Sequence, residues 1–279
     1  MIQLISDTLS CIPLDEANNM GLLYLPQIIV FGDKTYRDDS EIDSITFGEK
    51  LSVAKQLPTT AAPPPAIVEP IFKQIEEKGD TAIAICPSEK ISGTYRAYCT
   101  AKQEHPAADI RIIDVKTLGT AQGILVRIAK KMLDDGASAN EIESTLQELS
   151  AKTRTYFLVD TLEYLYKGGR IGAASKLVGS MLQMKPILQI VDGQIDAKET
   201  QRTTKKAIER FKEIILDECP ASDTSYLNIE HGGIVGKAQE FASTLKEESG
   251  VSTIPVNYLP PAIILHGGPT ILGCSFLVK

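Results

Sequence analysis

The chain has few of the residues that build metal centres and disulfide frameworks. It contains three histidines and five cysteines without a CxxC pair, namely Cys11, Cys86, Cys99, Cys219 and Cys274. Scattered cysteines predict neither a disulfide network nor a zinc site, so we expect reduced, structural thiols. With so few histidines, a histidine-based metal site is disfavoured too. We expect the protein to use no metal and no cofactor.

Positive charge is also scarce. Lysine and arginine number 29 against 36 acidic residues, the formal net charge is -7, and no basic run is present. A nucleic-acid partner is therefore disfavoured. No apolar stretch approaches the ~20 residues that span a bilayer, and the first residues lack the basic and apolar regions of a signal peptide. We expect a cytoplasmic protein.

Several signature loops are missing as well. The phosphate-binding patterns GxGxxG and GxxxxGK[ST] do not occur, so a nucleotide site is not supported. The GxSxG pentapeptide of serine hydrolases is absent too. One hydrolase interpretation stays open, in which Ser92 acts as nucleophile and His266, within the stretch "HGG", acts as its base.

Alternating strand and helix patterns are what the sequence does contain. The chain has 279 residues and 43% apolar content, enough for one large or two modest domains. Strand-like runs at 81–87, 109–115 and 154–160 are separated by helical patterns, which predicts βαβ units, and a further strand is expected at 2–6. The pattern changes after residue 160. We therefore predict an N-terminal α/β domain over residues 1–158 and a C-terminal α/β domain over 159–279.

Turn residues and helical periodicity predict the remaining elements. Gly32-Asp33 and Asp192-Gly193 each lie at the centre of a predicted hairpin, over 25–39 and 185–199. Apolar residues at helical spacing predict helices over Ile124 to Leu133, after Ser138, around Phe211 and over 234–248. Strands are expected at 225–230 and 252–258.

Three small residues, Ser92-Gly93-Thr94, join the strand at 81–87 to the helical pattern that follows it. The first backbone N–H groups of a helix have no partner within the helix, and the helix dipole favours negative charge there. We therefore expect an anion-binding site at this helix start, formed by Ser92, Gly93 and Thr94.

Two further segments carry candidate site residues. In "QLPTTAAPPP", Thr60 taken alone reads as a helix cap before prolines of a first turn. In "DTLEYLYKGGRIG", a short helix over 162–167 is expected to end at a left-handed stop formed by Gly168-Gly169, which leaves Arg170 projecting. Surface solvation and a functional role are equally open for Arg170.

These segments, in this order, resemble the DegV family of bacterial fatty-acid-binding proteins. The resemblance covers essentially the whole chain and rests on "LISD", "FGDKTYRDD", "TTAAPPP", "ISGTYRAYCTA", "DTLEYLYKGGRIG", "LQMKPILQIVDGQI", "RTTKKA" and "HGGPTILG". Three departures stand out. The family's Thr-Ser-Gln-Pro-Ser is Thr-Ala-Ala-Pro-Pro over residues 60–64, its Gly-Pro-Gly is Gly-Pro-Thr over 268–270, and its Asp-Ser-Thr is Asp-Thr-Leu over 7–9.

The resemblance implies a two-domain α/β fold, with an N-terminal Rossmann-like parallel sheet and a smaller C-terminal α/β domain. It implies that a long-chain fatty acid such as palmitate, stearate or oleate lies between the domains. Its carboxylate would meet Thr60 and Ser92, with His266 near the same head group. Arg170 and Arg202 would lie on the rim, where a kinase docks.

The implied role is that of a non-catalytic, lipid-carrying subunit of fatty acid kinase. It would present the carboxylate for phosphorylation to acyl phosphate, and brief contact with a membrane is left open. Two alternatives remain on the sequence, an esterase or acyltransferase that uses Ser92 and a carrier of another amphiphile.

Overall fold

Short, mostly apolar runs form the first sheet, and its two central strands are buried over most of their length. The computed structural model describes residues 1–179 and 184–279. Four parallel strands lie in the order β2 (Leu23–Leu25), β1 (Ile2–Asp7), β6 (Thr81–Cys86) and β7 (Asp109–Asp114). Parallel sheets need helices on both faces, and this explains why β6 reads as one continuous apolar run. The predictions of strands at 2–6, 81–87 and 109–115 are confirmed.

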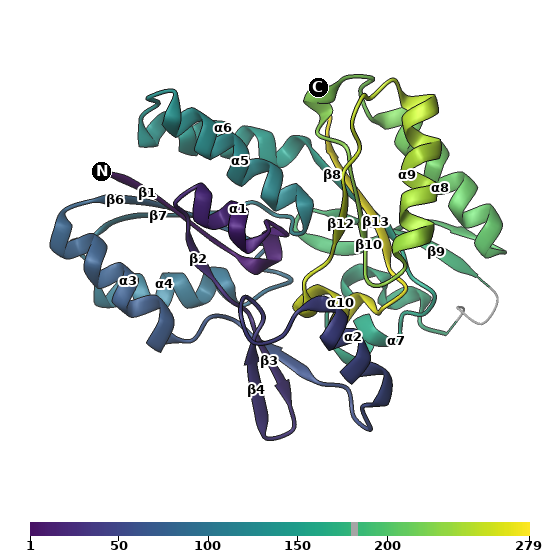
Figure 1. The fold of residues 1–279 in the computed structure, drawn as a ribbon, viewed down its shortest axis with the longest axis horizontal. Coiled ribbons are helices and arrows are strands. Elements are labelled where there is room, and N and C mark those ends of the chain that lie inside the picture. The colour runs from purple at the N-terminus through teal and green to yellow at the C-terminus, as the bar shows by residue number, and fades with distance from the viewer. Residues whose placement is uncertain (180–183) are drawn as a thin grey trace.

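Helices cover both faces of this sheet (Figure 1). One face packs against α3 (Pro65–Lys78) and α4 (Thr94–Glu104), and the other against α1 (Leu14–Asn19), α5 (Thr120–Asp134) and α6 (Ala139–Lys152). Local sequence explains two of the helix starts. Ser138 and Glu141 form a capping box at α6, and Pro65 occupies the first turn of α3, where its missing N–H costs no hydrogen bond.

The second sheet has six strands and mixed direction. Its order is β10 (Gln194–Gln201), β9 (Lys185–Val191), β8 (Thr153–Leu158), β13 (Leu272–Leu277), β11 (Asn228–His231) and β12 (Val256–Tyr258). One face packs against α8 (Thr204–Glu218) and α9 (Val235–Ser249), and the other faces α7 (Glu163–Lys167) and α10 (Pro261–Gly267). The predicted strands at 225–230 and 252–258 are confirmed as β11 and β12, with shorter bounds.

The prediction that residues 154–160 complete a βαβ unit is wrong. These residues form β8, which is antiparallel to both of its neighbours, β13 and β9, in the second sheet. A run of apolar residues indicates a buried strand, but it does not say which strand will pair with it. Both partners of β8 follow residue 158 in the chain, so the pairing of this strand crosses the predicted boundary although the strand itself ends at it. The division into domains at that residue stays a prediction.

Both predicted hairpins are confirmed. β3 (Ile28–Phe31) and β4 (Lys34–Arg37) pair around Gly32, whose φ of 57° suits a tight turn, and β5 (Thr59–Ala61) extends them to a three-stranded sheet. In the β9–β10 hairpin, Asp192 and Gly193 both have positive φ, 49° and 79°. The first two residues of the motif "LQMKPILQIVDGQI", 182–183, lie outside the described residues, and the rest of the motif is described.

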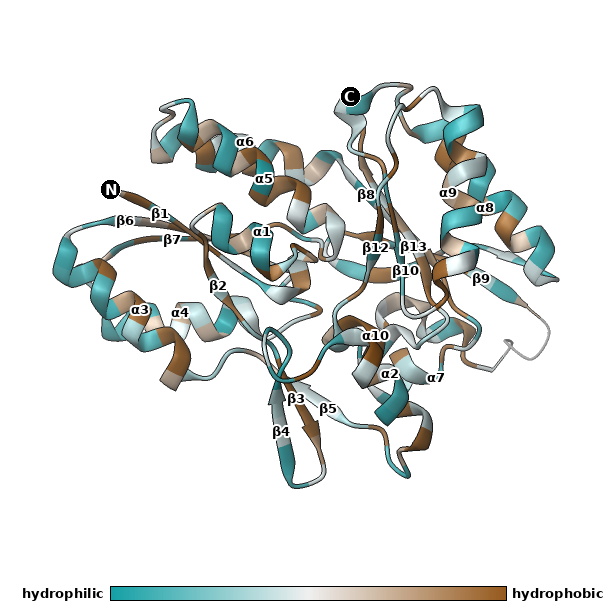
Figure 2. Ribbon diagram, in the orientation of Figure 1, coloured by the Kyte–Doolittle hydropathy of each residue, from teal (hydrophilic) through white to brown (hydrophobic). Residues whose placement is uncertain are grey.

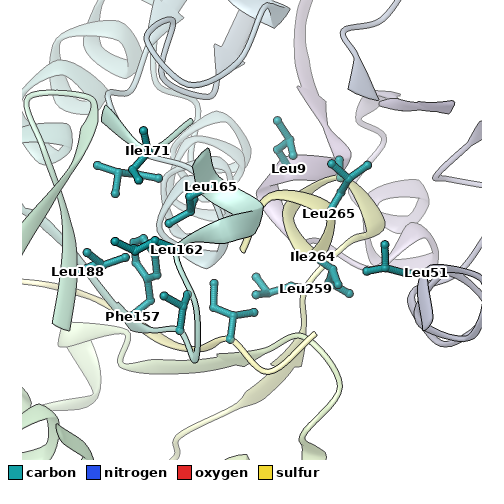
Figure 3. Packing of buried hydrophobic residues seen from close by; sticks show 14 of the residues in the cluster. Leu9, Leu51, Phe157, Leu162, Leu165, Ile171, Leu188, Leu259, Ile264 and Leu265 are labelled. Carbon is teal, nitrogen blue, oxygen red and sulfur yellow. The ribbon is translucent and has the colours of Figure 1, made fainter. Parts of the chain in front are cut away.

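A shared apolar core joins the two halves of the chain. Leu9, Ile29 and Phe47 from the first part pack in one cluster with Phe157 and Leu165 from the second. Figure 3 shows members of this cluster converging from several elements. Figure 2 shows mostly apolar strands lying between helices in which apolar and polar residues alternate. Among residues 1–179 and 184–279, no helix has both the length and the apolar character that crossing a bilayer requires.

Candidate functional site

A pocket opens within this shared core. Including its open mouth, it encloses about 820 Å³. Apolar side chains from both parts of the chain make up most of its wall, among them Leu9, Ile91, Phe157, Leu165, Ile190 and Ile271. The polar residues on the wall are few, and five of the predicted site residues lie there: Thr60, Ser92, Gly93, Arg170 and His266. A largely apolar cleft with a few polar groups is the usual form of a small-molecule site.

Thr60 and His266 meet in this pocket. Thr60 lies on β5 opposite Ile29, and its Oγ1 is 2.9 Å from Nε2 of His266 on α10. The interpretation of Thr60 as a helix cap is wrong, because α3 begins later and Pro64 is its capping residue. Strand pairing with β3 instead turns the Thr60 side chain toward α10.

The His266 ring is neutral. Burial, with a smaller contribution from the nearby Arg170 guanidinium, lowers the pKa of His266 to about 3. Its Nδ1 atom is buried without a hydrogen-bond partner in the described part of the chain. A buried lone pair without a partner is less costly than a buried N–H without one, so we assign the proton to Nε2. Nε2–H then donates to Thr60, and the Thr60 hydroxyl proton is left to donate to a ligand.

Gly168 makes room for this ring. A Cβ atom at Gly168 would collide with Nδ1 of His266. The left-handed stop predicted at Gly168-Gly169 is formed by Gly169, which has φ of 70°, whereas Gly168 is right-handed with φ of −77°. Glycine is therefore required at residue 168 for space and at residue 169 for backbone conformation.

Ser92 lies against the pocket at the start of α4. Its Oγ is 3.0 Å from Oγ1 of Thr94 and accepts a hydrogen bond from the Thr94 backbone N–H. Thr94 is fully buried and also accepts a hydrogen bond from Nε2 of Gln27. The backbone N–H of Thr94 is thus already hydrogen-bonded to Ser92. Of the residues in the predicted anion site, Ser92 and Gly93 line the pocket, whereas Thr94 does not.

Arg170 is half-buried and anchored. Its Nε donates to the carbonyl of Ile91 (3.1 Å) and its Nη1 to the carbonyl of Gly168 (2.7 Å). These bonds tie the segment before α4 to the segment after α7, so simple surface solvation does not describe this side chain. Arg202, by contrast, is exposed between β10 and α8 and is not among the residues that line the pocket.

Two buried carboxyl groups behind the site escaped sequence reasoning. Gln27, which lines the pocket, donates through its backbone N–H to Asp38 and through its side chain to Asp7. Burial raises the pKa of each of these aspartates to about 7. Both lie within quoted motifs, "LISD" and "FGDKTYRDD", but no spacing rule joins residues that meet through the distant Gln27 and through Thr8.

The site lacks the arrangement of a serine hydrolase. His266 Nε2 is engaged with Thr60, and its pKa of about 3 makes it a weak base. In the described residues no acid contacts Nδ1, where a triad would place one. The same part of the chain also holds no group of three or more side chains suited to a metal ion.

Comparison with known proteins agrees with this architecture. The family model described as "Uncharacterised protein, DegV family" matches residues 1–279. The chain belongs to the DegV family. Protein DegV of Bacillus subtilis is 34% identical over 279 residues, which cover 100% of this chain and 99% of that protein.

Solved DegV structures share the fold. A fatty acid binding DegV family protein from Streptococcus agalactiae matches with a TM-score of 0.90 and 26% identity, over 100% of this chain and 99% of the other. A DegV family protein from Thermus thermophilus, described for its fatty acid binding, matches with a TM-score of 0.86 and 27% identity over the same shares. The predicted fold class, a parallel α/β sheet with a second sheet domain, is therefore confirmed.

Proposed function

We propose that this DegV protein binds a long-chain fatty acid in the pocket of its shared core. The observation that carries the proposal is the pairing of an apolar wall with two hydroxyl groups, that of Thr60, held by His266, and that of Ser92 at the start of α4. A carboxylate prefers charge-assisted hydrogen bonds, and the N-terminus of α4 adds a favourable dipole. The fatty-acid-binding relatives support this assignment.

The apolar wall would supply most of the affinity. Each buried methylene gains ~0.8 kcal/mol, so a chain the size of palmitate gains on the order of 10 kcal/mol on leaving water. The polar residues would contribute less energy and instead fix which end of the molecule lies at Thr60. Palmitate, stearate and oleate all satisfy this chemistry.

The family resemblance leads us to propose a second step, presentation of the bound carboxylate to a fatty acid kinase. Arg170 suits such a role, because two backbone carbonyls hold its guanidinium at the pocket. The net charge of -7 opposes an anionic ATP-bearing partner, so positive groups near the pocket would guide it. Arg202 would act at a distance from the head group, on the exposed surface. The carrier itself would perform no chemistry and would work in the cytoplasm.

Mass spectrometry of extracted ligand tests the binding proposal. Freshly purified protein is denatured and extracted, and we expect close to one long-chain fatty acid per chain. Delipidated protein should also take up added oleate or palmitate. Recovery of no acyl chain, together with no uptake, would overturn the proposal. Recovery of a different amphiphile would show that this compound, and not a fatty acid, is the ligand.

A further inference from the structure

The wall of the pocket includes a buried carboxyl group that the proposed head-group site does not use. Glu230 lies on β11, directly opposite Gly273 of β13, and its side chain is 5% exposed. It lines the pocket together with Gly119 and Thr155. The head-group residues come from other elements, namely β5, the start of α4 and α10. The polar residues of the pocket wall thus come from two different sets of elements.

The two carboxyl oxygens of Glu230 have different surroundings. Oε1 accepts hydrogen bonds from the Thr120 backbone N–H (2.9 Å), the Thr120 hydroxyl and the Ser275 hydroxyl (2.9 Å). Oε2 accepts none of these bonds, and an added Cβ at Gly119 would stand 3.0 Å from Oε2 and 3.1 Å from Oε1. Gly119 has φ of 71°, and the absence of a side chain there leaves room for the carboxyl group where both residues line the pocket.

The same contacts leave Oε2 as the carboxyl oxygen that is available to a ligand. Three donors converge on Oε1, so this oxygen serves as the acceptor of the carboxyl group. In the described residues no lysine, arginine or histidine forms an ion pair with Glu230, and burial raises its pKa. A carboxylate oxygen accepts a hydrogen bond and a protonated one can donate, so Oε2 can bond a hydroxyl group in either state.

Neighbouring hydroxyls extend this polar region. Oγ1 of Thr155 is 3.3 Å from the Ser275 hydroxyl that bonds Glu230, and it is 3.1 Å from the Thr117 hydroxyl on its other side. Thr155 also lines the pocket. These hydroxyls bond one another, but no hydrogen bond to Oε2 of Glu230 is present in the described residues. An unsubstituted acyl chain would cover this oxygen without offering a hydrogen bond in return, and a buried polar atom without a partner is unfavourable.

We propose that the pocket is built for an acyl chain that carries a hydroxyl group, with the ligand hydroxyl hydrogen-bonded to Oε2 of Glu230. The substrate class is then a hydroxy fatty acid. This inference rests on the proposed fatty-acid binding and adds a specificity-determining residue to it. Sites that hydrogen-bond a substrate hydroxyl discriminate strongly against analogues that lack it.

The competing explanation is that Glu230 only joins β11 to the start of α5. Both explanations keep the three bonds to Oε1, but they differ in what Oε2 does. If Glu230 is purely structural, stearic acid and its hydroxylated derivatives will compete according to their apolar contacts alone. Selectivity therefore separates the two explanations, whereas stability does not.

A competition experiment tests the inference. Delipidated protein is incubated with equal amounts of stearic acid and one hydroxystearic acid, repurified and extracted, and the bound ratio is measured by mass spectrometry. The experiment is repeated for isomers that differ only in the position of the hydroxyl. We expect at least one isomer to be enriched about tenfold or more over stearic acid. Equal retention for every isomer would overturn the inference and leave fatty-acid binding intact, whereas retention of no acid would overturn both.

Two variants locate the selectivity. Glu230→Met keeps the side-chain length without polar atoms and should abolish the preference while stearic acid is still retained. Ser92→Ala is the matched control, since it should lower the loading of both acids while leaving their ratio unchanged. A preference that survives in Glu230→Met would overturn the role of Glu230. If that variant does not fold, the ratios for the parent protein decide the inference.

Discussion

Oγ1 of Thr60 lies 2.9 Å from Nε2 of His266, although 206 residues separate them in the chain. Because burial keeps the imidazole neutral and its Nε2–H holds the Thr60 oxygen, the hydroxyl proton faces the pocket. A strand residue and a helix residue therefore act together to provide one hydrogen-bond donor that points into the pocket. The first prediction follows from that geometry.

Thr60→Ala and Ser92→Ala should each weaken fatty-acid binding by roughly 1–3 kcal/mol, the usual cost when a charged acceptor loses a donor. The dissociation constant of delipidated protein for oleate measures this effect. The exposed neighbour Thr59 provides the control, and Thr59→Ala should leave affinity unchanged. If both site variants bind as tightly as the parent, the carboxylate lies elsewhere.

Gly168→Ala should destabilise the protein and weaken ligand binding together. The new methyl group would collide with the His266 ring, and overpacking of this kind costs about 1–3 kcal/mol. Thermal unfolding and oleate affinity are the measurements. Gly236→Ala on α9 is the control, because nothing lies within 4 Å of its added Cβ, and we expect no loss there. An unchanged Tm for Gly168→Ala would contradict the close contact with His266.

Arg170→Ala should leave fatty-acid content nearly unchanged but lower acyl-phosphate formation by the cognate kinase at least about tenfold, which corresponds to ~1.4 kcal/mol. Labelled acyl phosphate made from kinase, ATP and pre-loaded carrier is measured, with ligand content checked in parallel. Arg202→Ala serves for comparison, since this exposed residue is outside the pocket. Unchanged turnover would remove Arg170 from presentation, and loss of lipid would move it into the binding site.

Asp38→Asn should stabilise the protein increasingly as the pH rises from about 4 to about 7. Burial raises the pKa of Asp38 from 3.8 to about 7, so in this window the native state holds a proton that the unfolded state has released. The stabilisation that the protonated Asp38 provides is complete below its pKa in the unfolded state, 3.8. It is lost as the pH rises through its pKa in the folded state, about 7. The side-chain oxygen of asparagine can keep the hydrogen bonds from Thr8 and Gln27. The substitution also removes the group that ionises.

The measurement is the difference in unfolding free energy between parent and Asp38→Asn across this pH range. A difference is required because His266, whose lowered pKa is about 3, acts in the opposite sense as pH falls below 6.5. A difference that does not change with pH would show that Asp38 titrates normally in the native state.

Local sequence determined most of the individual elements. Gly32 and Asp192-Gly193 specify their hairpins because tight turns need positive φ, and Ser138 with Glu141 specifies the start of α6 through bonds within one turn. The family motifs also selected Thr60, Ser92, His266 and Arg170, which the fold brings to one pocket. The roles of these residues toward a ligand stay predictions.

Tertiary structure alone decided which elements meet. The partners of β8 come from later in the chain, so its apolar pattern could not place it in the second sheet. Gly168 is required by a ring nearly a hundred residues away, and Glu230 looked like an ordinary strand residue until β11 came to lie against the start of α5. Periodicity and turn chemistry act over a few residues, whereas burial, pKa values and hydrogen bonds across the core depend on contacts between distant segments.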